Sequence, residues 1–142
     1  MIYLVRRNDR TIKTYLERGD DCVLAEGETL EIQPQNFRDY AGRLRLSVNG
    51  CSGEEVRVMQ ASGSLQVLVE APHAEQVALQ INDRRETLPL KDGRGLYLLD
   101  TSKPGRFELS PADRTNYCAA GEALLVVQVA EMKQVRAKFS YP

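Results

Sequence analysis

The sequence predicts an all-β fold, an antiparallel β-sandwich with little or no helix, on three observations. Apolar and polar side chains alternate with period two in most segments, as they do in strands with one buried and one exposed face. Glycine, asparagine and aspartate recur between these segments, where tight turns need positive φ or side-chain hydrogen bonds. Strands about 8–12 residues apart, each followed by a turn, are typical of sandwiches and barrels.

The first half of the chain holds seven candidate strands. They span residues 2–7, 11–17, 21–25, 29–33, 43–48, 54–59 and 64–70. The cleanest alternation lies in 43–48, where Leu44, Leu46 and Val48 share one face and polar residues share the other. A strand of this kind has one buried and one wet face, which favours antiparallel pairing.

Six further candidates follow in the second half. They span residues 76–81, 86–90, 96–99, 106–109, 123–130 and 134–141. The segment 123–130 is apolar on both faces, which predicts a central strand or an interface strand. Pro89 lies in the candidate 86–90, and because proline cannot donate to a ladder, this strand is predicted at a sheet edge.

Helix is scarce, since residues 35–40 and 111–120 lack sustained 3.6-residue periodicity and are predicted to be loops with a turn or two. In residues 95–109, a Pro-Gly turn precedes alternating aromatic and aliphatic residues. This segment resembles the late strands of immunoglobulin-like modules, and the resemblance implies a sandwich that is immunoglobulin-like in the broad sense. The length suits one domain over residues 1–142, with a weak possible subdivision near 71–74.

Charge and cysteine usage indicate the class of partner and the compartment. Nineteen Lys and Arg residues oppose twenty Asp and Glu residues, for a net charge of −1, which argues against a nucleic-acid partner. The sequence has no apolar run long enough for a membrane span, so no membrane partner is predicted. The three scattered cysteines form no CxxC, and the N-terminus lacks the residue order of a signal peptide, which together predict a cytoplasmic location.

Residues that could form a catalytic or metal site are few. The one histidine, His73, lies in a predicted turn, and no serine stands in a Gly-x-Ser-x-Gly elbow. The short glycine loops at 50–53 and 93–95 fall between strand candidates, where glycine serves a hairpin. We therefore predict no catalytic, cofactor-binding or metal residues, and a chain that is not an enzyme.

A group of basic residues surrounds the hairpin that contains the predicted edge strand. Arg84, Arg85 and Arg94, with Tyr97 close in sequence, are the residue types that dominate interface hot spots. The alternative interpretation is an ordinary charged hairpin that protects an edge from aggregation. We take the four residues as the candidate interaction surface.

The predicted function is a non-catalytic protein-interaction module, or a small subunit of a larger cytosolic assembly, that acts by surface or edge-strand recognition. Its partner would be another protein or a second copy of the chain. The first alternative is a structural component of a phage, virion or surface assembly, which would self-assemble. The second is a small-ligand-binding or enzymatic β domain, which would have a deep pocket.

Overall fold

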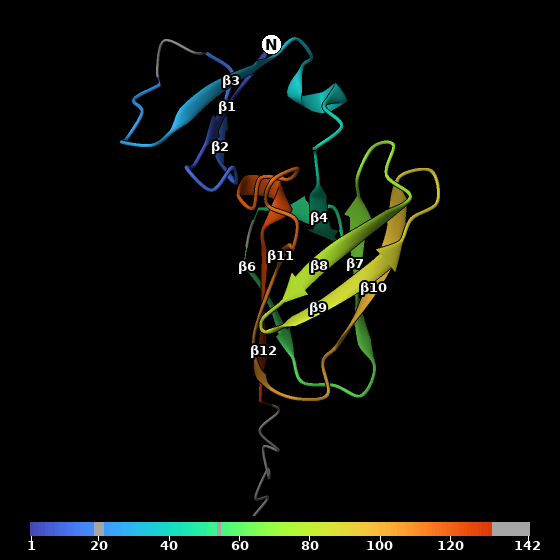
Figure 1. The fold of residues 1–142 in the computed structure, drawn as a ribbon. Helices are drawn as coiled ribbons and strands as arrows, with labels where there is room; N and C mark the ends of the chain where they lie inside the picture. The colour runs from blue at the N-terminus through green and yellow to red at the C-terminus, as the bar shows by residue number, and fades with distance from the viewer. Residues whose placement is uncertain (19–21, 54, 132–142) are drawn as a thin grey trace, which may run out of the picture.

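The computed structural model describes residues 1–18, 22–53 and 55–131, and the strands among them form three sheets (Figure 1). The N-terminal sheet has the order β2-β1-β3, with β1 at Ile2–Arg6, β2 at Ile12–Leu16 and β3 at Thr29–Gln33. The four-stranded sheet has the order β10-β7-β4-β5, with β10 at Arg94–Asp100, β7 at Ser64–Glu70, β4 at Arg45–Val48 and β5 at Cys51–Ser52. The five-stranded sheet has the order β6-β12-β11-β8-β9, with β6 at Glu55–Met59, β12 at Leu125–Ala130, β11 at Gly105–Pro111, β8 at Gln76–Ile81 and β9 at Arg84–Pro89.

The four- and five-stranded sheets share one hydrophobic core. Alternate residues of each strand point into it, as the period-two pattern predicts. Its completely buried side chains come from both sheets and include Leu46, Val67, Val69, Leu79, Leu109 and Leu125. The prediction of an all-β protein is therefore confirmed, because the described residues hold no α-helix and the helical structure is limited to the single 3-10 turns η2 (Phe37–Asp39) and η3 (Gly121–Ala123).

Pairing within the sheets is antiparallel with one exception. The described strands β6 and β12 run parallel, with Val56 opposite Val127 and Val58 opposite Val129. Parallel neighbours need a long connection between them. The chain meets this need because β6 precedes most of the sandwich and β12 ends it.

Two predictions about strand position agree with the structure. The strand β12, predicted to be central, lies between β6 and β11, although only its inward face is fully buried. The strand β9, which ends at Pro89, lies at the edge of its sheet. Its neighbour across the next turn, β10, is the edge of the other sheet, so both edges lie on the same side of the sandwich.

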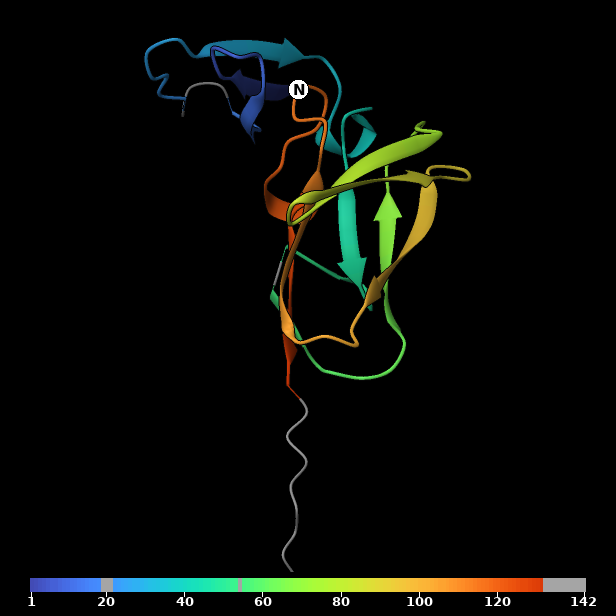
Figure 2. The ribbon, with the colours of Figure 1, turned by 60° about the horizontal axis from the view of Figure 1, so that its bottom comes forward.

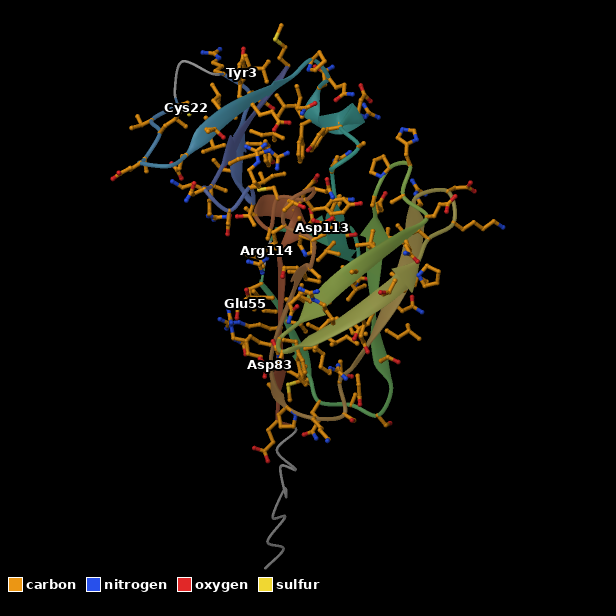
Figure 3. The ribbon with its side chains drawn as sticks, viewed as in Figure 1. Tyr3, Cys22, Glu55, Asp83, Asp113 and Arg114 are labelled. Carbon is orange, nitrogen blue, oxygen red and sulfur yellow. The ribbon has the colours of Figure 1, made fainter. Side chains whose placement is uncertain are left out.

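The N-terminal sheet lies at one end of the molecule and has a separate small core (Figures 1 and 2). Ile2, Leu4 and Ile12 pack there with Cys118, which comes from the connection between β11 and β12. Figure 3 labels Asp113 and Arg114 in this connection. The Ile12 amide donates to the Arg114 carbonyl at 2.8 Å, so a late segment of the chain attaches the first sheet to the sandwich.

One expected strand is absent and another falls outside the described residues. Residues 22–25 do not form the strand expected over 21–25, and residue 21 is not described; Val23 is 91% exposed, so no apolar face holds this segment in place. The expected strand at 134–141 lies outside the described residues. Residues 71–74 form the turn by which the chain passes from β7 in one sheet to β8 in the other. None of the helical turns in the described residues has the length and apolar character needed to span a bilayer.

Candidate functional site

The structure divides the four predicted interaction residues among three places. Arg84 and Arg85 begin β9 opposite Ile81 and Gln80, so their side chains leave opposite faces of the sheet. Arg84 and Tyr97 are brought together on the side between the two sheets. Arg94 lies at the other end of β10, opposite Glu70 on the outer face of the four-stranded sheet.

Tyr97 is held by a carboxylate between the sheets. Burial of the phenol and a hydrogen bond to Glu86 raise the pKa of Tyr97 to about 12, against a smaller opposing effect of the Arg84 charge. Atom Oε2 of Glu86 is buried and has no hydrogen-bond partner among the described residues. The Tyr97 hydroxyl therefore has a partner inside the fold, and the ring is half-buried.

The exposed side chains of β10 are two leucines that precede and follow Tyr97. Leu96 is 53% exposed and Leu98 is 57% exposed, because they alternate with the inward-facing Tyr97 and Leu99. Leu96 lies opposite the half-buried Leu68 of β7. We call Leu68, Leu96 and Leu98 the leucine strip; it lies on the outer face of the four-stranded sheet.

Charged residues border the leucine strip at both ends of β10. At the first end, Arg94 Nε lies 3.6 Å from Glu70 Oε2, and Arg45 NH1 lies 3.3 Å from Glu70 Oε1. The Arg94 side chain nevertheless keeps 71% of its surface exposed. At the other end stands Asp100, whose hydrogen bonds to Ser102 lower the pKa of its carboxyl below the usual range. The exposed side of β10 thus has a cation, two leucines and an anion at alternate positions.

The backbone edge of β10 is also open. Among the described residues, β10 forms a ladder only with β7, and on its other side it makes a single bridge between Lys91 and Arg94 in the turn from β9. The rest of this edge pairs with no described strand, and residues 88–90, where β9 ends, lie close to it at Gly95, so its open part begins after that residue. An open edge beside an exposed apolar strip is a template for strand addition.

A cleft of about 720 Å³ lies next to the strip, between the end of the four-stranded sheet and the turns at 71–75 and 90–93. Arg43, Arg45 and Arg94 line it together with Glu70 and His73. Each arginine already has a carboxylate partner: Arg43 Nε lies 2.7 Å from Glu122 Oε1, and Glu70 binds the other two. The hydrogen bond to Glu122 raises the pKa of the Arg43 guanidinium.

The cleft has few groups for covalent chemistry. Its lining residues include no serine, threonine, cysteine or lysine, and His73, the sole histidine, sits in the turn at φ 63°. Within the described ranges, no three His, Cys, Asp or Glu side chains gather closely enough to hold a metal ion. The arrangement can bind through its arginines and carboxylates, but it contains no nucleophile paired with a base.

The leucine strip was not predicted from the sequence, from which Tyr97 was taken as the interaction residue of this segment. Both faces of 95–99 are apolar, so alternation alone could not decide which one points outward. The signal that decides it is the pair Arg94 and Asp100, which share a face with Leu96 and Leu98 and mark that face as solvent-exposed.

The basic residues near the N-terminus have a structural role. Arg6 binds Glu31, with 2.5 Å between Nε and Oε2, and its NH1 donates to the Thr115 carbonyl at 2.7 Å. This arginine therefore fastens the N-terminal sheet to the connection between β11 and β12.

No protein-family model, no curated protein and no solved structure matches this chain.

Proposed function

We propose that this chain is a non-catalytic protein-interaction module, or a small subunit of a larger cytosolic assembly, and that it recognises its partner through the open edge of β10. The observation that carries the proposal is the exposure of Leu96 and Leu98 on an edge strand whose outer hydrogen-bonding side is open. Main-chain hydrogen bonds would supply affinity, and alternate side chains would supply specificity.

The side chains of β10 define the partner's pattern. In a strand added beside β10, side chains directly opposite each other interact on the same face. Lys91 already lies opposite Arg94 on this side. The partner would therefore place apolar residues opposite Leu96 and Leu98 and a basic residue opposite Asp100. The expected partner is thus an extended segment with two apolar residues and a basic residue at alternate positions.

A display library of seven-residue strands with this alternating pattern tests the proposal on the full chain. We expect selected peptides to bind, and Leu98→Asp to weaken them about tenfold or more, because it removes roughly the apolar contribution of one buried leucine and places a charge there. Fluorescence polarisation measures the affinity of each selected peptide.

Met59→Asp is the matched control for this experiment. Met59 is 56% exposed on the opposite edge strand β6, so it receives the same charge at almost the same exposure. Peptides that bind wild type and Met59→Asp equally, and Leu98→Asp weakly, support the proposal. A library without binders, or binders that lose nothing with Leu98→Asp, would contradict it.

The fold of the sandwich is part of the proposal. Its connectivity supports an immunoglobulin-like architecture in the broad sense, because two sheets with strand orders β10-β7-β4 and β12-β11-β8 are joined by connections that cross between them. The early strands divide between the sheets, since β4 and β5 belong to one and β6 to the other. The cytoplasmic location is supported by the three cysteines, all of which are free thiols.

A small-ligand function is the second candidate, and the 720 Å³ cleft is the observation that favours it. Because its three arginines are matched by Glu70 and Glu122, the ligand would carry both acceptor and donor groups rather than a high negative charge. Calorimetry with Arg43→Met would separate this function from strand addition, since Arg43 lies in the cleft and outside β10.

A further inference from the structure

The N-terminal sheet has an apolar face that belongs to neither hydrophobic cluster. The pairing register places Tyr3 opposite Leu16 and Ile32, and Val5 opposite Leu30. We call these five side chains the outer face of the N-terminal sheet: Tyr3, Val5, Leu16, Leu30 and Ile32. The opposite face of the sheet is the one that packs on the sandwich.

The outer face is exposed along β3, whereas Val5 in the central strand is buried. Ile32 is 58% exposed and Leu30 is 36% exposed. Two of the large hydrophobic side chains that are exposed in the described part of the chain, Leu30 and Ile32, lie side by side on this face. Adjacent exposed apolar side chains of this kind favour an interaction site.

The two edges of this sheet differ in their backbone contacts. The edge strand β2 is engaged, because the Ile12 amide donates to the Arg114 carbonyl and Cys118 Sγ lies 3.9 Å from the Lys13 carbonyl oxygen. The edge strand β3 pairs with β1 on one side, and no described backbone group pairs with its other side. An added strand would therefore enter beside β3.

The sequence of the chain contains a segment that suits this position. In residues 132–142, Val135, Ala137, Phe139 and Tyr141 alternate with Gln134, Arg136, Lys138 and Ser140. A strand with this pattern beside β3 would put its apolar residues on the side of Leu30 and Ile32. The same pairing would put its basic residues on the side of Glu31, whose carboxylate also binds Arg6.

The charges of the two segments are complementary. Residues 17–33 contain six acidic residues and one basic residue, whereas residues 132–142 contain three basic residues and no acidic one. Opposite charges of this size draw two segments together and suppress the approach of like segments. The net charge of the whole chain is only −1, so it does not reveal the opposite charges of these two segments.

The N-terminal sheet and the end of β12 lie at opposite ends of the molecule (Figure 1). The strand β12 runs away from the N-terminal sheet and ends far from it, and Tyr3 marks the sheet at the other end (Figures 1 and 3). Because the described chain ends far from its own N-terminal sheet (Figure 1), the segment that follows β12 is expected to meet the sheet of a second molecule more readily.

We propose that residues 132–142 of one copy add as a strand beside β3 and cover the outer face of the N-terminal sheet of a second copy. Contacts of this head-to-tail kind join two different surfaces, so they continue from copy to copy, either into a closed ring or along an open chain. The interface is separate from the leucine strip on β10, and it does not depend on the function proposed for that strip.

Complementation between two defective variants tests the proposal on the full chain. Ile32→Asp damages the sheet and keeps the C-terminal segment, while Phe139→Asp does the reverse. We expect wild type to gain mass above 16.0 kDa as its concentration rises in analytical ultracentrifugation. Each variant alone should associate about tenfold more weakly or worse, since each loses one large apolar contact and gains a charge within it.

An equal mixture of the two variants should recover a dimer and stop there. The intact segment of Ile32→Asp can bind the intact sheet of Phe139→Asp. The sheet and the segment that remain free in this pair each carry an aspartate, so a third copy cannot add. If wild type stays monomeric at every concentration, or the mixture stays monomeric, the proposal is wrong. Association that Ile32→Asp abolishes and Phe139→Asp leaves unchanged would also overturn it, because two sheets would then pack on each other directly.

Matched controls separate these effects from general damage. Leu98→Asp has the same change at 57% exposure on β10, and Ser140→Asp puts the charge on the polar side of the C-terminal segment. Both should associate like wild type. Circular dichroism of all variants should show the wild-type strand content, and self-association lost through Leu98→Asp would assign the contact to β10 and contradict the proposal.

Discussion

At the scale of single residues, the two buried serines make opposite predictions. Ser47 is 1% exposed and its hydroxyl has no hydrogen-bond partner among the described residues, whereas Ser110 is 2% exposed and accepts a hydrogen bond from Arg114 at 3.2 Å. A buried hydroxyl without a partner costs about 1–3 kcal/mol of desolvation. The buried hydroxyl of Ser47 therefore lowers the stability of the fold, whereas the buried hydroxyl of Ser110 increases it.

Ser47→Ala should raise the free energy of unfolding by about 1 kcal/mol, because it removes the buried hydroxyl without opening a large cavity. Ser110→Ala should lower it by about the same amount, because the buried hydrogen bond to Arg114 is lost. Urea denaturation followed by circular dichroism measures both. A loss of stability in Ser47→Ala would mean that its hydroxyl does have a partner in solution.

Tyr97 gives a prediction for alkaline pH. Its pKa is raised from the usual 10.0 to about 12, so between these values the phenol ionises in the unfolded chain and stays protonated in the folded one. Stability from this group is complete below pH 10 and is lost as the pH rises toward 12. Tyr97→Phe should therefore flatten the decline of the unfolding free energy in this range relative to wild type, and identical slopes would contradict the assignment.

At the scale of elements, one glycine allows the late connection to reach the linker that follows the N-terminal sheet. A side chain at Gly42 would place Cβ 2.3 Å from the backbone carbonyl oxygen of Asn116. Because a backbone atom gives way less readily than a side chain, the contact can be relieved only by moving the 112–120 connection. Gly42 thus permits the approach that attaches one sheet to the other two.

Gly42→Ala should lower the free energy of unfolding by about 1–3 kcal/mol through this overpacking. Hydrogen exchange of the Ile12 amide, which donates to Arg114, should accelerate at the same time. Gly50→Ala is the control, because Gly50 has open space around it and only its φ of 82° is strained. Unchanged protection of Ile12 in Gly42→Ala would show that the connection adjusts without releasing the sheet.

The elements also show how far alternation alone can predict this fold. The strands Thr29–Gln33, Ser64–Glu70 and Gln76–Ile81 begin and end at the residues that the sequence predicted, since each has apolar residues on one face and turn residues at its ends. The two-residue strand β5 was missed because it is too short for a period to be visible.

The candidate site was harder to predict, for a different physical reason. Which residues meet across a turn depends on the face that each strand presents, and neither face of 95–99 is polar in the sequence. Arg84 and Arg85 are neighbours along the chain and point to opposite sides of the sheet, so closeness in sequence did not make them one surface.

At the scale of the whole molecule, the two proposed surfaces lie on different units. The leucine strip is part of the sandwich, and the outer face is part of the N-terminal sheet, which has its own small core. A copy held in a head-to-tail chain would still present β10 to a partner. Self-assembly and partner recognition are therefore compatible in one molecule, as a subunit of a larger assembly requires.

The attachment of the first sheet by the last connection also sets an order of events during synthesis. Arg6 donates a hydrogen bond to the carbonyl of Thr115, which is 109 positions later in the chain. The carbonyl of Lys13 accepts one from Cys118, which is 105 positions later. The ribosome releases the amino-terminal strands long before these contacts exist, so Ile2, Leu4 and Ile12 stay uncovered on the nascent chain while the sandwich is being made. These strands must therefore be protected from aggregation until residues 115–118 have been made.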